Sequence, residues 1–221
     1  MRRVLVLRPE PGASATVAKA RTIGLDAAAA PLFAIEPVAW QAPGPSDLDA
    51  LLLTSANAVR MGGAELMKLR GLPVHAVGEV TAQAARDAGF GVASAGEAGV
   101  DRLLDSLEPD LKLLHLCGED HREPHDAPQA ITPVIVYRAR AIEGADLSEA
   151  KGAVILVHSP RAGRRLAELT GDRGSIAIAA ISAAAAEAAG TGWERVETAD
   201  RSTDEALLAL AARLCNKPAP Q

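Results

Sequence analysis

A strand-to-helix pattern occurs twice in this sequence, about a hundred residues apart. In residues 49–60 a short apolar run stops at Thr54-Ser55, and a helical pattern then continues to residue 69. Residues 154–165 repeat this order, with Ser159 in the place of Ser55. Short apolar runs are typical of strands buried on both faces of a parallel sheet, and a hydroxyl side chain directly after them caps the next helix. The recurrence therefore predicts two copies of one α/β unit.

The rest of the chain alternates in the same way, and its 221 residues suit two domains of about 100 residues each. An opening strand–helix–strand pattern over residues 3–30 has no continuation until the last third of the chain, so we expect it to complete the sheet formed there. The predicted fold class is α/β, with two similar parallel-sheet, flavodoxin-like domains, the first of them discontinuous, joined by a two-stranded linker. The expected boundaries are residues 1–33 plus 140–221 for domain 1, 41–132 for domain 2, and 34–40 and 133–139 for the linker strands.

Composition and charge exclude several classes of function. The formal net charge is −5, which argues against broad binding to nucleic acids or to anionic membranes. No apolar run approaches the roughly 18 residues that a membrane-spanning helix needs, so we expect no membrane partner. Cys117 and Cys215 lie far apart without a paired framework, and we therefore expect a reducing, cytoplasmic location. The sequence has no heptad pattern, which predicts a monomer.

The turns that follow the predicted strands are rich in hydroxyl side chains and poor in carboxylates. In open parallel sheets, ligands bind beyond the carboxyl ends of the strands, where helix amino termini point and favour a negative charge. An acidic protein with such turns, and with arginines near them, is suited to bind a small polyanionic molecule between its domains. The alternative is that these hydroxyls are only helix caps and that the arginines only keep the protein dissolved. The candidate binding residues are Arg8, Thr54, Ser55, Thr81, Ser159 and Ser182.

Other kinds of site have weaker support. His115, Cys117, Asp120, His121 and His125 have a spacing that matches no zinc motif, so we expect no metal. Because the sequence contains no glycine-rich dinucleotide motif, Walker A motif or Gly-x-Ser-x-Gly motif, it predicts neither a nucleotide cofactor nor a hydrolase triad. Tyr137, the only tyrosine, lies on the second predicted linker, where it either packs or acts on a ligand between the domains.

Seven short segments, spread over nearly the whole chain, carry a resemblance to a known family. They are VLRP (6–9), APLFAIEP (30–37), LTSANAV (53–59), AVGEVTA (76–82), PVIVYR (133–138), HSPR (158–161) and STDEAL (202–207). In this order and spacing, they resemble the segments of the uroporphyrinogen-III synthase family. The resemblance implies two α/β domains joined by a two-stranded linker, with the substrate in the cleft between them.

The resemblance also implies a cyclising lyase that needs no cofactor. Such enzymes close hydroxymethylbilane, a linear tetrapyrrole with many carboxylates, to uroporphyrinogen III, with loss of water and inversion of the terminal ring D through a spiro intermediate. The bilane also closes spontaneously to the type I isomer, so the enzyme must favour one conformation and one transition state over a competing path. The implied partners are hydroxymethylbilane and, transiently, the preceding deaminase.

The resemblance assigns roles to individual residues where the motifs match. Tyr137 corresponds to the linker tyrosine of the family, which is implicated in the departure of the substrate hydroxyl. Thr81 corresponds to a threonine at a helix start that faces the cleft. The backbone amides at Ser55, Ser159 and Ser182 are expected to meet substrate carboxylates.

The chain departs from the family pattern in two places. Ala183, Ala184 and Ala185 follow Ser182 where some relatives carry threonines, so hydroxyl contacts there are absent or not essential. The crossover over residues 118–132 is shorter and richer in proline than the family pattern. The alternative function is a non-catalytic two-domain binding protein for a small polyanionic ligand. A small two-domain glycosyltransferase, a second rival, would need a nucleotide-sugar site that the sequence does not contain.

Overall fold

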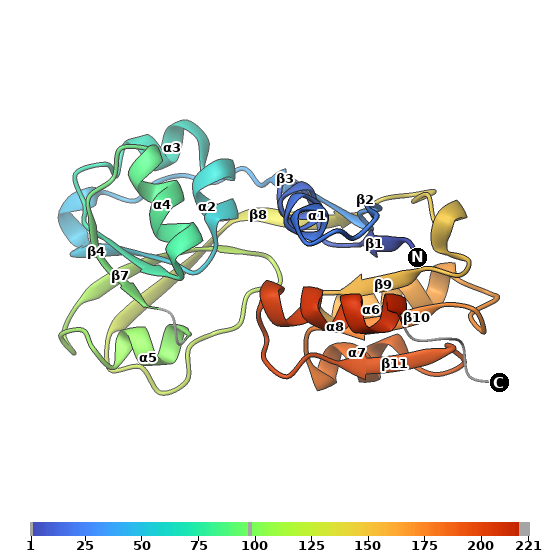
Figure 1. Ribbon diagram of the computed structural model, residues 1–221. Coiled ribbons are helices and arrows are strands. Elements are labelled where there is room, and N and C mark those ends of the chain that lie inside the picture. Colours follow the sequence, from blue (N-terminus) through green and yellow to red (C-terminus); the bar gives the residue numbers. More distant parts are fainter. Residues whose placement is uncertain (1, 97–98, 217–221) are drawn as a thin grey trace. The chain divides into compact units, whose positions relative to one another are not determined.

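The computed structural model describes residues 2–96 and 99–216, and the chain divides into two compact units (Figure 1). Unit 1 consists of Met1–Ala34 and Arg140–Gln221, and unit 2 of Ile35–Ala139. Each unit contains a sheet with parallel strand pairs and helical connections, so the predicted α/β class is confirmed. Within the two described ranges, none of the helices is long and apolar enough to cross a membrane.

The sheet of unit 1 is built from the short strands β1 (Val4–Val6), β2 (Ala27–Ala29), β9 (Val154–Val157), β10 (Ala177–Ala180) and β11 (Arg195–Thr198). All neighbouring pairs are parallel, in the order β11-β10-β9-β1-β2. Strands β1, β9 and β10 are buried along their whole length, as aliphatic strands covered on both faces must be. After β1 the next strand is added towards the β2 edge of the sheet, whereas after β9 the next strand is added towards the β11 edge. The switch point therefore lies between the carboxyl ends of β1 and β9.

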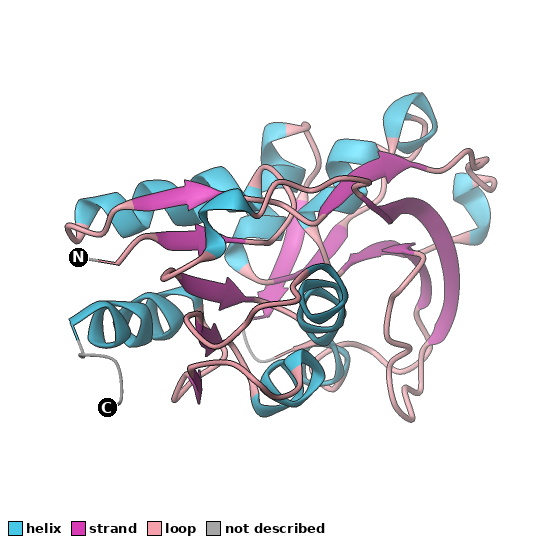
Figure 2. Cartoon of the chain, turned by 90° about the vertical axis from the view of Figure 1, so that its right-hand side faces the viewer, coloured by secondary structure: helices cyan, strands magenta, loops and turns pink. Residues whose placement is uncertain are grey.

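The helices of unit 1, cyan like the others in Figure 2, are α1 (Gly12–Thr22), α6 (Pro160–Leu169), α7 (Ala183–Ala189) and α8 (Asp204–Asn216). Helices α1 and α8 pack on one face of the sheet, against alternate strand residues such as Val4, Val6 and Leu156. Helices α6 and α7 belong to crossovers that run the opposite way along the sheet, which puts them on the other face. They touch at Gly163, where an added Cβ would lie 2.8 Å from the carbonyl oxygen of Ala185.

The sheet of unit 2 is built from β3 (Phe33–Pro37), β4 (Ala50–Leu53), β5 (Val74–Val77), β6 (Val92–Gly96), β7 (Lys112–Gly118) and β8 (Ala130–Ala141). Their order is β3-β8-β7-β4-β5-β6, and the pairs from β8 to β6 are parallel. Strand β4 is buried throughout and pairs with both β5 and β7. After β4 the next strand is added towards the β6 edge, and after β7 towards the β3 edge, so this sheet has its switch point between β4 and β7.

The helices of unit 2 are α2 (Ala56–Met61), α3 (Gly63–Met67), α4 (Glu79–Asp87) and α5 (Val100–Leu104). A single 3-10 turn, η1 (Pro45–Asp47), precedes β4. A second one, η2 (Ser148–Ala150), belongs to unit 1 and precedes β9. The single helix that the sequence predicts after Ser55 is wrong: Gly63 has φ +61°, a left-handed conformation that separates α2 from α3. Between β7 and β8, residues 119–129 form turns and irregular chain rather than a helix.

The two sheets have the same spatial order once β7 and β8 are matched with β1 and β2. Unit 1 reads β2-β1-β9-β10-β11, and unit 2 reads β8-β7-β4-β5-β6. The two units thus share one strand arrangement but differ in chain order: the matched pair β1 and β2 comes first in unit 1, whereas β7 and β8 come last in unit 2. The segments predicted as linker strands, residues 34–40 and 133–139, overlap β3 and β8, which pair in the sheet of unit 2 and each span a boundary between the units in the sequence.

Candidate active site

A pocket of about 420 Å³ lies at the switch point of unit 2, beyond the carboxyl ends of β4 and β7. The turns after these two strands supply most of its walls, and β8 supplies Tyr137 and Ala139. The pocket therefore brings the predicted residues Thr54 and Ser55 together with Tyr137, which lies more than eighty positions further along the chain. Its polar lining comprises Thr54, Ser55, Asn57, Glu119, Asp120, His121, Arg122 and Tyr137.

Tyr137 is half-buried, and its ring packs directly over the backbone of Gly118. A Cβ added to Gly118 would lie 2.6 Å from Cε2 and Cζ of Tyr137, so this close approach requires glycine. The carbonyl oxygen of Tyr137 accepts a hydrogen bond of 3.0 Å from the backbone N–H of Glu119. Within the described residues, the Tyr137 hydroxyl forms no hydrogen bond. The backbone and ring are thus fixed while the hydroxyl stays available to a ligand.

The Thr54-Ser55 turn connects the buried strand β4 to α2, and its two hydroxyls have different tasks. Ser55 is the N-cap of α2, with extended φ −152° and ψ 138°, and its Oγ accepts a hydrogen bond of 3.2 Å from the N–H of Asn57. Thr54 instead lies 3.0 Å, from Oγ1 to Nε2, from His115. The serine hydroxyl is therefore structural, and the threonine hydroxyl connects the pocket to a buried imidazole.

His115 is the buried group behind this pocket. It lies on β7, the residue is 1% exposed, and its ring meets that of His121 edge to face with centroids 5.6 Å apart. Burial, with a smaller contribution from His121, lowers the pKa of His115 to about 4. The imidazole is therefore neutral at physiological pH. His121 is anchored on the other side, because its Nδ1 donates to the carbonyl oxygen of Gly118 at 3.0 Å.

Thr81 lies at the start of α4, as the sequence predicts, and its contact with a ligand stays a prediction. It is 5% exposed in the first turn of α4 and does not line the pocket at the switch point. Its N–H donates to the carbonyl oxygen of Gly78, whose φ of +82° starts the turn. The threonine side chain is thus packed within unit 2.

The remaining predicted residues, Arg8, Ser159 and Ser182, lie at the carboxyl ends of strands in unit 1. Ser159 caps α6, and its Oγ accepts a hydrogen bond of 3.2 Å from the N–H of Ala162. Ser182 caps α7 in the same way, at 3.3 Å from the N–H of Ala185. Both side chains are occupied as caps, so any ligand would meet the first backbone amides of the helices.

Arg8 belongs to a charged cluster centred on Asp204 at the switch point of unit 1. Both carboxylate oxygens of Asp204 accept from the hydroxyl of Thr16 at 3.1 Å, and His158 donates from Nε2 at 3.2 Å. The guanidinium of Arg8 lies 3.7 Å away and the ammonium of Lys19 also 3.7 Å. Burial alone would raise the pKa of the Asp204 carboxyl, but the hydrogen bonds and charges of His158, Thr16 and Arg8 outweigh burial and lower it.

Comparison with known proteins places this geometry in a family. The sequence profile described as "Uroporphyrinogen-III synthase HemD" matches residues 14–209, which is most of the chain. The chain belongs to the uroporphyrinogen-III synthase family. This membership confirms the resemblance that the seven sequence segments carry, and it makes the tetrapyrrole-forming lyase the function that the site has to explain.

Solved structures agree with the family assignment at the level of fold. The uroporphyrinogen-III synthetase of Helicobacter pylori superposes with a TM-score of 0.69 at 18% identity, over 97% of this chain and 100% of that one. A mutant uroporphyrinogen III synthase of Thermus thermophilus gives a TM-score of 0.50, also at 18% identity, over 98% and 100%. No curated protein sequence is a significant match. The chain therefore shares the fold of these synthases while its sequence differs from theirs at most positions.

The sequence did not predict two pairs of residues at the switch points of the two sheets: His115 with His121 in unit 2, and His158 with Asp204 in unit 1. His115 and His121 were considered only as metal ligands, and His158 and Asp204 only as members of family segments. Their contacts join positions far apart in the chain, and only the placement of HSPR and STDEAL after predicted strands pointed to the second pair. In the described ranges, no three His, Cys, Asp or Glu side chains come together to hold a metal ion.

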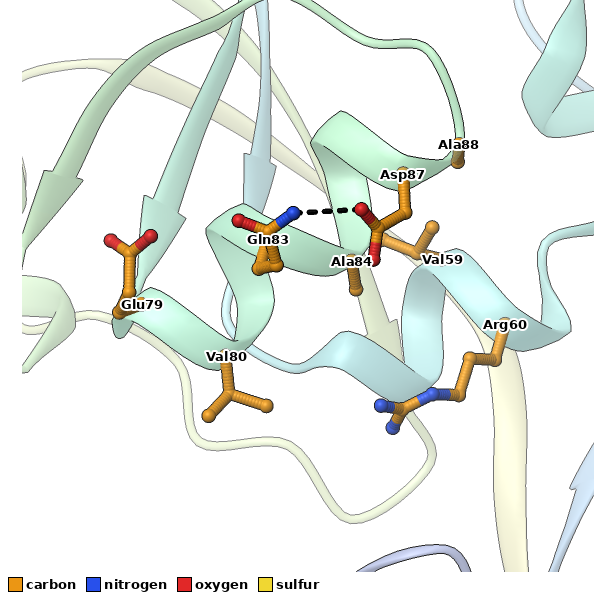
Figure 3. A pocket seen from close by; sticks show the side chains of 8 residues that line it. All are labelled: Val59, Arg60, Glu79, Val80, Gln83, Ala84, Asp87 and Ala88. Carbon is orange, nitrogen blue, oxygen red and sulfur yellow. Dashed lines mark hydrogen bonds between the residues drawn. The ribbon is translucent and has the colours of Figure 1, made fainter.

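A wider groove of about 660 Å³ lies elsewhere on unit 2, between α2 and α4. Figure 3 shows its lining, which combines the apolar Val59 and Val80 with the charged Arg60, Glu79 and Asp87. Its drawn hydrogen bond, 2.7 Å from Nε2 of Gln83 to Oδ1 of Asp87, lies along the surface of α4. None of the residues predicted to act on a ligand lines this groove, so the pocket with Tyr137 is the better site.

Proposed function

We propose that this chain converts hydroxymethylbilane to uroporphyrinogen III, with loss of water and inversion of ring D. Membership of the uroporphyrinogen-III synthase family over residues 14–209 carries the proposal. The position of Tyr137 supports it, because the tyrosine lies in a pocket at a switch point, where parallel sheets bind their ligands.

Carboxylate binding is assigned to the carboxyl ends of both sheets. Each helix amino terminus favours a nearby negative charge by about 0.3–1 kcal/mol, and the substrate carries many carboxylates. The helices capped by Ser55, Ser159 and Ser182 supply backbone amides at these ends, and Arg8 supplies a guanidinium held near Asp204. An acidic chain can therefore hold a polyanion through local dipoles and one fixed positive charge.

Tyr137 is assigned to the departure of the substrate hydroxyl. Its hydroxyl opens on the pocket without a hydrogen bond inside the described part of the chain, so it can donate to the leaving oxygen. Proton transfer by a positioned side chain contributes about 10²- to 10⁴-fold to a rate. Because the uncatalysed reaction already proceeds, this contribution and a suitable substrate conformation suffice.

Product selectivity sets the size of the catalytic task. The type III path must be favoured by about 2.7 kcal/mol over spontaneous closure for a hundredfold excess of that isomer. A few amide–carboxylate contacts that hold ring D in one orientation are of this size. Neither a metal ion nor a redox group is needed for this step.

The proposal extends to the organisation of the enzyme. Units 1 and 2 act as two similar domains, with β3 and β8 as the linker between them. The protein works without a cofactor, as a monomer in the cytoplasm, and takes its unstable substrate from the preceding deaminase during a transient contact.

Isomer analysis tests the reaction directly. Purified protein receives freshly generated hydroxymethylbilane, and the oxidised products are separated into type I and type III. We expect type III to dominate, whereas a type I to type III ratio equal to that of the enzyme-free control refutes the proposal. A non-catalytic polyanion binder would also leave this ratio unchanged.

A further inference from the structure

A second cavity in unit 2, of about 360 Å³, adjoins the two histidines behind the pocket. His115, His121 and Gln129 line it, and each has a buried polar atom without a hydrogen bond in the described residues: Nδ1 of His115, Nε2 of His121 and Oε1 of Gln129. A buried polar atom without a partner destabilises the folded state, so three of them around one cavity require an explanation.

The existing hydrogen bonds fix what two of these atoms can do. Nδ1 of His121 donates to the carbonyl oxygen of Gly118, so the neutral ring has an acceptor at Nε2. The side-chain nitrogen of Gln129 lies 3.0 to 3.4 Å from the carbonyl oxygens of Leu104, Leu107 and Glu108, so its Oε1 is left as an acceptor. The cavity therefore presents two fixed acceptors.

The third atom depends on the tautomer of His115. If the hydroxyl of Thr54 donates to Nε2, the neutral ring carries its proton on Nδ1 and presents a donor to the cavity. A water molecule that accepts this proton and donates to His121 and Gln129 then satisfies all three atoms. Buried waters make about three hydrogen bonds, and the cavity exceeds the roughly 30 Å³ that a water occupies. The opposite tautomer would present three acceptors, which a single water cannot satisfy.

We propose that Thr54, His115, a water in this cavity and His121 form a proton path that serves the substrate pocket. The proposal rests on the proposed function. Thr54 is the end that touches the substrate, because it lines the pocket and contacts His115. His115 and His121 are positioning residues behind it, and His121 lines both the pocket and the cavity.

The protons of the reaction balance along this path. The C–O bond breaks with its electron pair on oxygen, and the leaving group departs as water after Tyr137 has given it a proton. The freed methylene carbon first bonds to the substituted α-carbon of ring D and forms the spiro intermediate. The older bond from that α-carbon to its methylene bridge then breaks, and the bridge carbon bonds to the free α-carbon of ring D, which loses one proton when the pyrrole regains its aromaticity. We assign this proton to Thr54, which passes its own proton to His115. One proton is given and one is taken, so exchange with solvent restores both groups and no oxidant or reductant is used.

Nuclear magnetic resonance tests the hydrogen-bond frame without any substrate. Long-range proton–nitrogen spectra of chain labelled with ¹⁵N-histidine should show His115 protonated at Nδ1 with Nε2 as acceptor, and His121 also protonated at Nδ1. His115 protonated at Nε2 overturns the proposal, because the cavity would then hold three acceptors.

Kinetics test the path itself. Thr54→Val removes the hydroxyl, and His121→Asn keeps a donor for Gly118 but removes the Nε2 acceptor. Both variants should lower kcat for type III formation at least about tenfold with little change in KM, and Thr54→Ser, which keeps the hydroxyl, should recover kcat relative to Thr54→Val. His125→Asn is the matched control, because this histidine is 83% exposed and lines neither the pocket nor the cavity.

Two outcomes separate a failed path from a failed function. Wild-type chain that makes type III together with unchanged kcat in Thr54→Val or His121→Asn overturns the path alone, as does an effect confined to KM. Wild-type chain whose isomer ratio equals that of the enzyme-free control overturns the proposed function and the catalytic use of the path with it. The spectra still decide the tautomers in that case.

Discussion

The substitution Gly118→Ala tests whether catalysis depends on the position of the Tyr137 ring, because it adds one methyl group where that ring contacts Gly118. In Gly118→Ala, the new Cβ would lie 2.6 Å from two ring carbons of Tyr137 and 2.9 Å from its hydroxyl. Non-bonded carbons rest about 3.5–4.0 Å apart, so the ring has to move by about 1 Å. Strand β7, which ends at Gly118, pairs with β4 on one side and β8 on the other, so its backbone cannot retreat instead.

Two magnitudes follow from this displacement. Overpacking costs about 1–3 kcal/mol of unfolding free energy. A displacement of about 1 Å at a reacting group costs roughly 100-fold in rate. We therefore expect Gly118→Ala to fold with reduced stability and to form type III roughly a hundredfold more slowly, so that spontaneous type I closure dominates its products.

Urea unfolding and isomer-resolved kinetics measure both effects. Gly91→Ala is the matched control, because no described residue other than its own chain neighbours lies within 4 Å of its added Cβ, and it should behave as wild type. In a Tyr137→Ala background the clash is gone, so adding Gly118→Ala should cost little further stability. A Gly118→Ala variant with the wild-type rate and unfolding free energy would show that the ring does not depend on this contact.

Further predictions concern the hydroxyl, the buried imidazole and the contact between two helices. Tyr137→Phe should lower kcat for type III by about 10²-fold or more while its urea midpoint stays at the wild-type value; unchanged kinetics would remove the hydroxyl from the mechanism. Because the pKa of His115 is about 4 when folded and 6.5 when unfolded, the unfolded chain binds more protons between these values. Stability should therefore fall by up to about 3 kcal/mol as the pH drops from 6.5 to 4, a loss absent from His115→Gln and present in His125→Gln. Gly163→Ala should cost about 1–3 kcal/mol in urea unfolding, because its Cβ would meet the backbone of α7 at 2.8 Å, whereas Gly174→Ala, with open space around its Cβ, should be neutral.

The sequence predicted those features of the fold that depend on local pattern. Apolar runs followed by hydroxyls indicated buried parallel strands with capped helices, and Ser55, Ser159 and Ser182 are N-caps in the structure. The break between α2 and α3 was missed because apolar periodicity continues through it, whereas the left-handed backbone at Gly63 is what ends the helix.

The candidate site could be predicted only in part, because its geometry depends on long-range register. The ring of Tyr137 reaches Gly118 where the pairing of β7 with β8 shifts by one residue, and no local pattern signals that shift. Similarly, His121 meets His115 through the irregular chain after β7, and Asp204 meets His158 across the switch point of unit 1. Residue type marked these positions as candidates, and only the fold determined their partners.

Unit 1 is built from two separate segments of the chain and unit 2 from one, and this difference has a consequence for synthesis on the ribosome. Unit 2 is one continuous segment, so all its strands have been made once residue 141 has been added. Strands β1 and β2 are made first, yet β1 pairs with β9, which begins at residue 154. At about 5–20 residues per second, β1 waits roughly 7–30 seconds for that neighbour. All strands of unit 2 are thus available for pairing while β1 still lacks β9, so the nascent chain exposes one unpaired edge of β1 during this interval.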